Sequence, residues 1–278
     1  MNQEFAQLNL LDSKSLYDVK PFSVYLPNPN SHLHAGYVLD YAGHGELENA
    51  EKWLYEHFTY NINTYGFRNP EFENETDLAA FGCSFTYGTG LADRMLWHSI
   101  LAKDLNMHVT NFGLPARSIA TIVDVFLIVS KHIKIKHAVF LFPSISRLQI
   151  AKKHVRNDYI SYLNTCVDYK SALNESYELN DDYIYRAIPE EEMHKICRNQ
   201  VYLLEHMARL RGIKVYISSW ELETYNFLKK LNLNSAILLA PWMSGSIEFA
   251  NDDKARDGKH PGPKHHFKWA NEIKDMIK

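Results

Sequence analysis

The chain has 278 residues, of which 46% are apolar, and its 30 Lys and Arg against 33 Asp and Glu give a formal net charge of −3. This length allows one large domain or two small ones, and the lack of a basic run argues against nucleic acid as a partner. The three cysteines, Cys83, Cys166 and Cys197, are too few and too scattered for a disulfide framework, which fits a reducing compartment.

No targeting or membrane segment is expected. Residues 1–15 lack a basic stretch followed by an apolar core, so the sequence predicts no secretory signal peptide. No apolar run approaches the roughly 18 residues of a membrane span. We therefore expect a globular, cytoplasmic protein, while the sequence leaves the oligomeric state open.

The chain divides into an irregular beginning and a regular remainder. Residues 1–76 carry Asn, Pro and aromatic residues without a clean period, which predicts an irregular N-terminal extension packed on the core. From residue 77 on, short apolar runs alternate with longer amphipathic ones. This alternation is typical of an α/β domain over 77–278 with a parallel sheet covered by helices.

The expected elements follow in chain order. Strands are predicted over 77–85, 108–114, 137–143 and 213–220, with a further candidate strand over 235–241. Helices are predicted over 97–105, 118–133, 189–212 and 263–278. Ser118 is the expected N-cap of the second helix, and Gly212 marks the end of the third.

Residues 151–188 interrupt this alternation and are predicted to be an insertion over one end of the sheet. The segment mixes Asn, Asp and Ser with tyrosines at 159, 162, 169, 177, 183 and 185. Tyrosine offers a flat apolar face and a hydrogen-bonding tip, which suits a sugar ring better than a fatty chain. The alternative is that these tyrosines only pack the insertion onto the core.

Ser84 stands where the first strand is expected to end. In open α/β sheets the ligand crevice lies outside the carboxyl ends of the strands, so this serine is well placed for chemistry. A serine needs a base to become a nucleophile. Near the end of the chain, "DGKHPG" places Asp257 three residues before His260, where a carboxylate can orient an imidazole.

Each of these residues also has a structural interpretation. A serine in a Gly-rich turn is ordinary by itself, and Gly113 could serve a positive φ. Asp257 with His260, His265 and His266 could hold a metal, but we expect none because the 265–266 pair begins the last helix and faces partly outward. The order Ser, Asp, His favours catalysis.

The motifs "FGCSFTYG", "NFGLPARS" and "DGKHPG" together resemble the SGNH hydrolases, also called GDSL-type esterases and lipases. The resemblance covers roughly 77–278 and implies a three-layer α/β/α fold related to flavodoxin. It implies Ser84 as nucleophile, Asp257 as orienting acid and His260 as base. The family's Asp before the serine is Cys83 here.

The resemblance also implies an oxyanion hole built from the amides of Ser84 and Gly113. The family's third donor is an Asn that "FPSISR" (142–147) lacks, so Ser144, Ser146 or Arg147 would donate from this loop.

The expected function is hydrolysis of a short acyl ester through an acyl-enzyme, with O-acetyl carbohydrate as one candidate substrate. No cofactor is expected. The alternatives are a catalytically inactive module that binds a ligand and an acyltransferase that uses the same serine.

Overall fold

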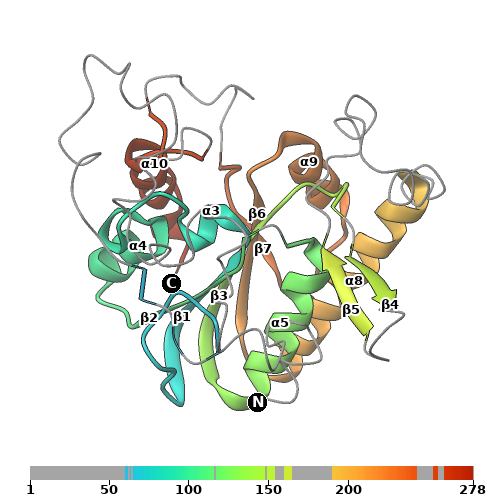
Figure 1. Ribbon diagram of the computed structural model, residues 1–278, viewed down its shortest axis with the longest axis horizontal. Helices are drawn as coiled ribbons and strands as arrows, with labels where there is room; N and C mark the ends of the chain where they lie inside the picture. The colour runs from blue at the N-terminus through green and yellow to red at the C-terminus, as the bar shows by residue number, and fades with distance from the viewer. Residues whose placement is uncertain are drawn as a thin grey trace.

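The computed structural model describes residues 60, 61, 63, 65–115, 117–147, 190–242, 253–255 and 260–277, together with the backbone of 149–153 and 160–164. Its centre is a parallel five-stranded sheet in the order β2-β1-β3-β6-β7 (Figure 1). The strands are β1 (Glu75–Gly82), β2 (Val109–Gly113), β3 (Lys134–Phe142), β6 (Lys214–Ser219) and β7 (Ile237–Leu238). This is the flavodoxin-like strand order.

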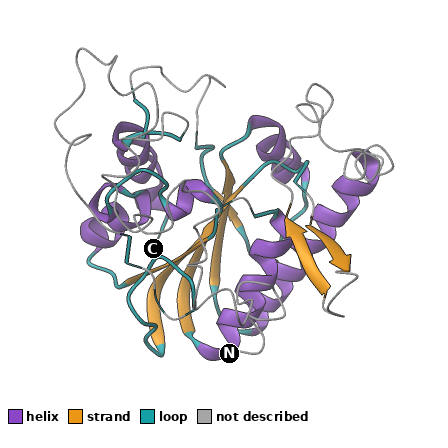
Figure 2. Cartoon of the chain, viewed as in Figure 1, coloured by secondary structure: helices purple, strands orange, loops and turns teal. Residues whose placement is uncertain are grey.

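Helices cover both faces of the sheet, as Figure 2 shows. On one face α4 (Trp97–Leu105) and α10 (Pro263–Ile273) form a common core with the sheet, and 3-10 turns at Asp93–Met95 and Lys274–Met276 flank them. On the other face lie α5 (Ile119–His132), α8 (Glu190–Leu210) and α9 (Leu222–Lys230). The predicted three-layer α/β/α sandwich is thereby confirmed.

The predicted helices and strands occur close to their expected positions. Helix α4 has the predicted bounds, and Ser118 caps α5 by accepting the N–H of Thr121 at 3.3 Å. The elements that were not predicted include the four-residue helix α3 (Ser84–Tyr87) and α9, which begins after Trp220 and Glu221 at the end of β6. The candidate strand over 235–241 shortens to the two residues of β7.

One described feature falls on the predicted insertion, an antiparallel pair formed by β4 (Gln149–Lys153), which begins two residues before it, and β5 (Ile160–Asn164). The side chains of all six tyrosines in the insertion lie outside the described residues, as do Cys166 and residues 1–59.

Stacked phenylalanines hold the three central strands together. The ring of Phe81 in β1 lies between Phe112 of β2 and Phe140 of β3, with centroid separations of 5.0 and 4.7 Å. All three side chains are buried. Because removing a buried phenylalanine side chain costs about 3–5 kcal/mol, this stack fixes the strand that leads to Ser84.

Residues 65–74 pack against the chain that follows α3. Phe67 is fully buried, and the guanidinium of Arg68 donates to the carbonyls of Tyr87, Gly88 and Leu91. Arg68 also pairs with Asp93 at 2.6 Å. These contacts fix the loop after α3.

Among the described helices, none combines the length and apolar character needed to cross a membrane.

Candidate active site

The strand order places its switch point between β1 and β3, where ligands bind in folds of this type. Ser84 lies two residues after the end of β1, and the loop 144–147 follows β3. The chain can turn so sharply after β1 because residue 82 is glycine. A Cβ there would lie 2.1 Å from Thr86 Oγ1 and 2.8 Å from the carbonyl oxygen of Leu141.

Ser84 begins α3 and is 7% exposed. Its Oγ lies 4.0 Å from the sulfur of Cys83, a buried free thiol. An N–H at the start of a helix has no acceptor within the helix, so the Ser84 amide is a candidate donor to a ligand. The hydroxyl and the amide therefore start from the same short helix at the switch point.

His260 lies beside the residue that follows Ser84. The rings of His260 and Phe85 are 5.8 Å apart between centroids in an edge-to-face arrangement. This contact brings the C-terminal motif to the end of β1. Asp257 lies outside the described residues, so its relation to His260 stays a prediction.

A short antiparallel connection positions His260. We call residues 253–255 and 260–262 the closing stem, because Ala255 N–H donates to the His260 carbonyl at 2.8 Å and Gly262 N–H to the Asp253 carbonyl at 2.9 Å. Lys254 and Pro261 form the bridge between its two sides. The stem therefore fixes the backbone of His260 itself.

Asp253 joins the closing stem to α10 and was missed by the sequence analysis. Its carboxylate accepts the amides of Lys264 and His265 and pairs with Nδ1 of His265 at 2.5 Å. Burial raises the pKa of Asp253, but the hydrogen bonds from His265 and Lys264 outweigh it and lower the pKa below its usual value. Asp253 thus acts as a charged cap for α10.

The prediction that the 265–266 pair faces partly outward is wrong for His266. Its side chain is buried, and Nδ1 accepts the N–H of Trp97 at 3.1 Å. Burial lowers the pKa of His266 well below its usual value, so its ring is a neutral packing group. His265 is engaged by Asp253, as described above.

Gly113 is required by close packing rather than by backbone conformation. Its φ is not positive, but a Cβ there would lie 2.3 Å from the backbone nitrogen of Tyr87 in α3. Its N–H donates to Asn111 Oδ1 at 2.8 Å. To hold an oxyanion, this amide would have to exchange its present acceptor.

The loop after β3 is a tight turn fixed by α9. Ser144 Oγ lies 2.7 Å from Ser146 Oγ and accepts the Ser146 amide at 3.2 Å. The Ile145 amide donates to Thr224 Oγ1 at 2.8 Å. Ser144 and Ser146 therefore satisfy each other, while the Arg147 guanidinium extends over the ring of Trp220, with Cζ 5.5 Å from the ring centroid.

His98 is a further buried histidine below α3. A carbonyl oxygen can only accept, so Nε2 of His98 carries the proton that is donated to Thr86 O at 3.2 Å. Burial is the main cause that lowers the pKa of His98 to about 3. This ring supports α3 as a neutral donor and is not a base for Ser84 at neutral pH.

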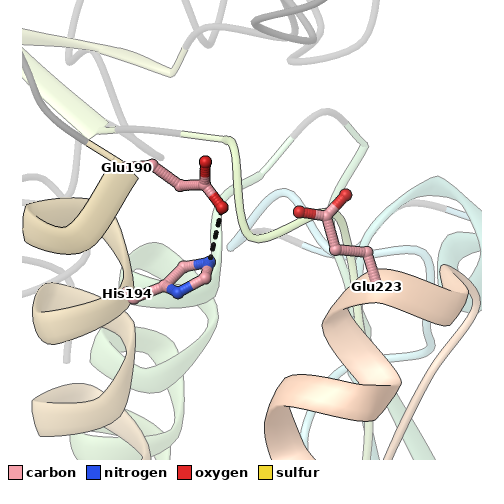
Figure 3. Close-up of side chains that lie close together, drawn as sticks. All are labelled: Glu190, His194 and Glu223. Atoms are coloured by element: carbon pink, nitrogen blue, oxygen red, sulfur yellow. Dashed lines mark ion pairs between the residues drawn. The ribbon is translucent and has the colours of Figure 1, made fainter.

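One group of three potential metal ligands occurs among the described residues, formed by Glu190, His194 and Glu223 (Figure 3). The figure shows Glu190 and His194 on α8 and Glu223 on α9, with ligand atoms within 4.8 Å of one another. Both glutamates are exposed, and Glu190 lies in the first turn of α8, where an acidic residue is favoured by the helix dipole. Nε2 of His194 lies 3.8 Å from Glu190 Oε1, one turn away on the same helix.

The comparisons with known proteins gave structural similarities alone. No protein-family model and no curated protein matches the chain. Similar solved structures include an esterase from Pseudoalteromonas sp. at 11% identity and a TM-score of 0.44, over 74% of this chain and 97% of that one. An acetyl xylan esterase from the rumen bacterium Butyrivibrio proteoclasticus matches at 12% identity and a TM-score of 0.43, over 80% of this chain and 66% of that one.

A third similar structure is a member of the lipolytic protein G-D-S-L family from Veillonella parvula, at 12% identity and a TM-score of 0.43, over 72% of this chain and 96% of that one. Lipolytic proteins of the G-D-S-L family, which the sequence motifs resemble, thus recur among the solved structures similar to this chain.

Proposed function

We propose that the chain is a serine ester hydrolase of the SGNH type, with Ser84 as nucleophile and His260 as base. The observation that carries this proposal is the contact between Phe85 and His260, with ring centroids 5.8 Å apart. It brings an imidazole next to the residue that follows Ser84, at the switch point of a parallel sheet. The same two residues were selected from the sequence for their chemistry.

The proposed reaction has two steps. His260 takes the proton of Ser84 Oγ as the oxygen attacks the ester carbonyl, and it then protonates the leaving alcohol. Water, activated by His260, hydrolyses the acyl-enzyme and regenerates the serine. Asp257 is proposed to hold the imidazole in the required tautomer.

The tetrahedral intermediates need donors for their oxyanion, and the amide of Ser84 is the first candidate. Gly113 is the second, provided that its amide exchanges Asn111 for the substrate. The third donor is proposed to come from Ser144, Ser146 or Arg147. The two serines would have to break their mutual hydrogen bond to donate.

The proposed substrate is a short acyl ester, with an O-acetyl carbohydrate as the first candidate. This part of the proposal rests on the composition of the insertion 151–188, whose six tyrosines alternate with polar residues. A panel of esters from acetate to palmitate tests the length of the acyl chain, and a rate that rises beyond about eight carbons would contradict the proposal.

The proposed domain division is an extension over 1–76 and a hydrolase-like domain over 77–278.

The proposed nucleophile is tested with a fluorophosphonate probe and with para-nitrophenyl acetate. We expect labelling and turnover in the wild type and in Ser99→Ala, a matched control on α4. Both should be lost in Ser84→Ala, because removing one member of a triad costs several orders of magnitude in rate. His260→Ala should lose nearly all turnover, and Asp257→Asn most of it. Circular dichroism checks that each variant is folded.

A catalytically inactive binding module is the second candidate. The occupied amide of Gly113 favours it, because one donor of the oxyanion hole is then already engaged. An unlabelled Ser84 in a folded wild-type protein would support this candidate over the hydrolase.

A further inference from the structure

Arg147 is a charged group without a counter-ion among the described residues. Among the described residues no carboxylate lies within ion-pair distance of its guanidinium, and its buried Nη1 has no hydrogen-bond acceptor. A guanidinium stays charged at any physiological pH, and a buried donor without an acceptor costs free energy. Arg68 differs, because three carbonyls accept from its Nη1 and Nη2 and Asp93 supplies a counter-charge, although its Nε has no acceptor.

The position of Arg147 is fixed by its neighbours. Its backbone N–H closes the turn onto the Ser144 carbonyl at 3.1 Å, and α9 holds the same turn through Thr224. Its guanidinium lies over the ring of Trp220. A cation above an indole ring is attracted by the electrons of that ring, so the charge is held at this place without an anion.

Trp220 connects Arg147 to the proposed nucleophile. Its ring stacks on Phe85 with centroids 4.9 Å apart and planes 10° apart, and Phe85 directly follows Ser84. The Trp220 amide donates to the Phe142 carbonyl at 3.4 Å, which ties the end of β6 to the end of β3. The guanidinium is therefore two ring contacts away from the residue next to Ser84.

Two indole donors beside Phe85 are also unsatisfied. Among the described residues, neither the buried indole N–H of Trp220 nor that of Trp242, whose ring lies 6.0 Å from Phe85, has an acceptor. Together with Nη1 of Arg147, which lies over Trp220, they make three N–H donors without acceptors. A negatively charged oxygen group supplies several acceptors and a counter-charge at once, and the planar fork of an arginine fits it in two bonds.

We propose that Arg147 and Trp220 form a subsite for an anionic oxygen group, a carboxylate or a phosphate, carried by the ester that Ser84 cleaves. The inference rests on the proposed function for the presence of an ester, but the binding of the anion does not depend on turnover. It assigns to Arg147 recognition of the substrate instead of donation to the oxyanion.

The first experiment measures anion binding without catalysis. Ser84→Ala is titrated at constant ionic strength with monomethyl adipate, with inorganic phosphate and with neutral dimethyl adipate, and tryptophan fluorescence is followed. We expect saturable changes with one or both anions and none with the neutral diester. Adding Arg147→Gln or Trp220→Phe should abolish them, whereas Arg198→Gln, an exposed arginine on α8, should not. No saturable change, or one that persists with Arg147→Gln, would overturn the proposal.

The second experiment separates substrate recognition from the oxyanion role. Rates of the wild type are compared for para-acetoxybenzoate and its neutral methyl ester, and for mono-para-nitrophenyl adipate and its methyl ester. We expect kcat/KM to favour the anionic member of at least one pair. Arg147→Gln should lower that preference about 10- to 100-fold through KM, and Arg147→Lys should lower it less. An equal fall in kcat for charged and neutral esters would assign Arg147 to the oxyanion hole instead and refute the subsite.

If the protein hydrolyses no ester, the titration still decides whether the anion subsite exists. If it hydrolyses both members of each pair equally and binds no anion, the proposed function stands and the subsite falls.

Discussion

Asp253→Asn should destabilise the protein at neutral pH while keeping the shape of the side chain. The change removes the charge that pairs with His265 and caps α10. Losing a capping carboxylate costs about 1 kcal/mol, and losing a charge-assisted hydrogen bond costs about 1.5–3 kcal/mol. Because the asparagine oxygen can still accept one amide, we expect a net loss of about 2 kcal/mol. For a domain of this size that corresponds to a melting temperature about 4–8 °C lower.

The pH dependence of this loss follows from the direction of the pKa shift. The pKa of Asp253 is lower in the folded state than in the unfolded state, so its stabilisation is complete above the unfolded value of 3.8. It disappears as the pH falls through the folded value. Thermal unfolding by circular dichroism should therefore show a large difference between wild type and variant at pH 7, which shrinks as the pH is lowered below 3.8.

The control for this experiment is Asp104→Asn, since Asp104 forms a surface pair with Lys274 at 4.0 Å. Surface pairs contribute about 0–1 kcal/mol, so this variant should melt within about 4 °C of the wild type and less far below it than Asp253→Asn. Equal melting temperatures for Asp253→Asn and the wild type at pH 7 would refute the role of Asp253 as a charged cap.

Three further substitutions test the core around the site. Gly113→Ala should lower the free energy of unfolding in urea by about 2 kcal/mol or more, because its Cβ would meet the backbone of Tyr87; an unchanged free energy would show that α3 can move away. His98→Gln should make the free energy of unfolding depend less on pH. The pKa of His98 is about 3 in the folded state and 6.5 in the unfolded state, so the wild type is fully stable with respect to this group above pH 6.5 and loses stability as the pH falls below that value. Urea unfolding should then show the wild type losing about 2–3 kcal/mol more than the variant between pH 6 and pH 4. Asp124→Asn should stabilise the protein at pH 7.5 but not at pH 4, because burial raises the pKa of Asp124 to about 6 and the wild type loses stability as the pH rises through that value. Allowing for its partial exposure, we expect about 1–2 kcal/mol in urea unfolding, and an equal gain at both pH values would contradict this cause.

Most strands of the sheet and most helices that cover it could be predicted, because each leaves a pattern in residues that are neighbours along the chain. The continuous apolar run of β3 and the capped, amphipathic pattern of α5 each depend on neighbouring residues of the chain. Helix α9 was missed because it begins two residues after β6 without a capping hydrogen bond from its N-cap residue. Its short sequence, LETYNFLKK, gives few turns in which a helical period could be recognised.

Site residues could be predicted only where a short motif of neighbouring residues pointed to them. Ser84 and His260 could be selected from short motifs, whereas Asp253 lies twelve positions before its partner His265 in a segment without a helical pattern. Trp220 and Trp242 were not selected from the sequence, and they became informative only in the fold, where both rings contact Phe85. Such pairings depend on the order of strands in the sheet, which no local pattern encodes.

The arrangement of the closing stem links stability to the proposed chemistry. His260 belongs to the stem, and the stem is attached to α10 through the carboxylate of Asp253. A weaker cap would loosen the backbone of His260 before it unfolds the sheet, because the three central strands are held by the separate stack of Phe81 with its neighbours. If His260 is the base, Asp253→Asn should therefore lose ester turnover at temperatures below those at which the sheet melts. Turnover and far-ultraviolet circular dichroism recorded on the same heating ramp would reveal this gap, and coincident loss of the two signals would show that stem and sheet unfold as one unit.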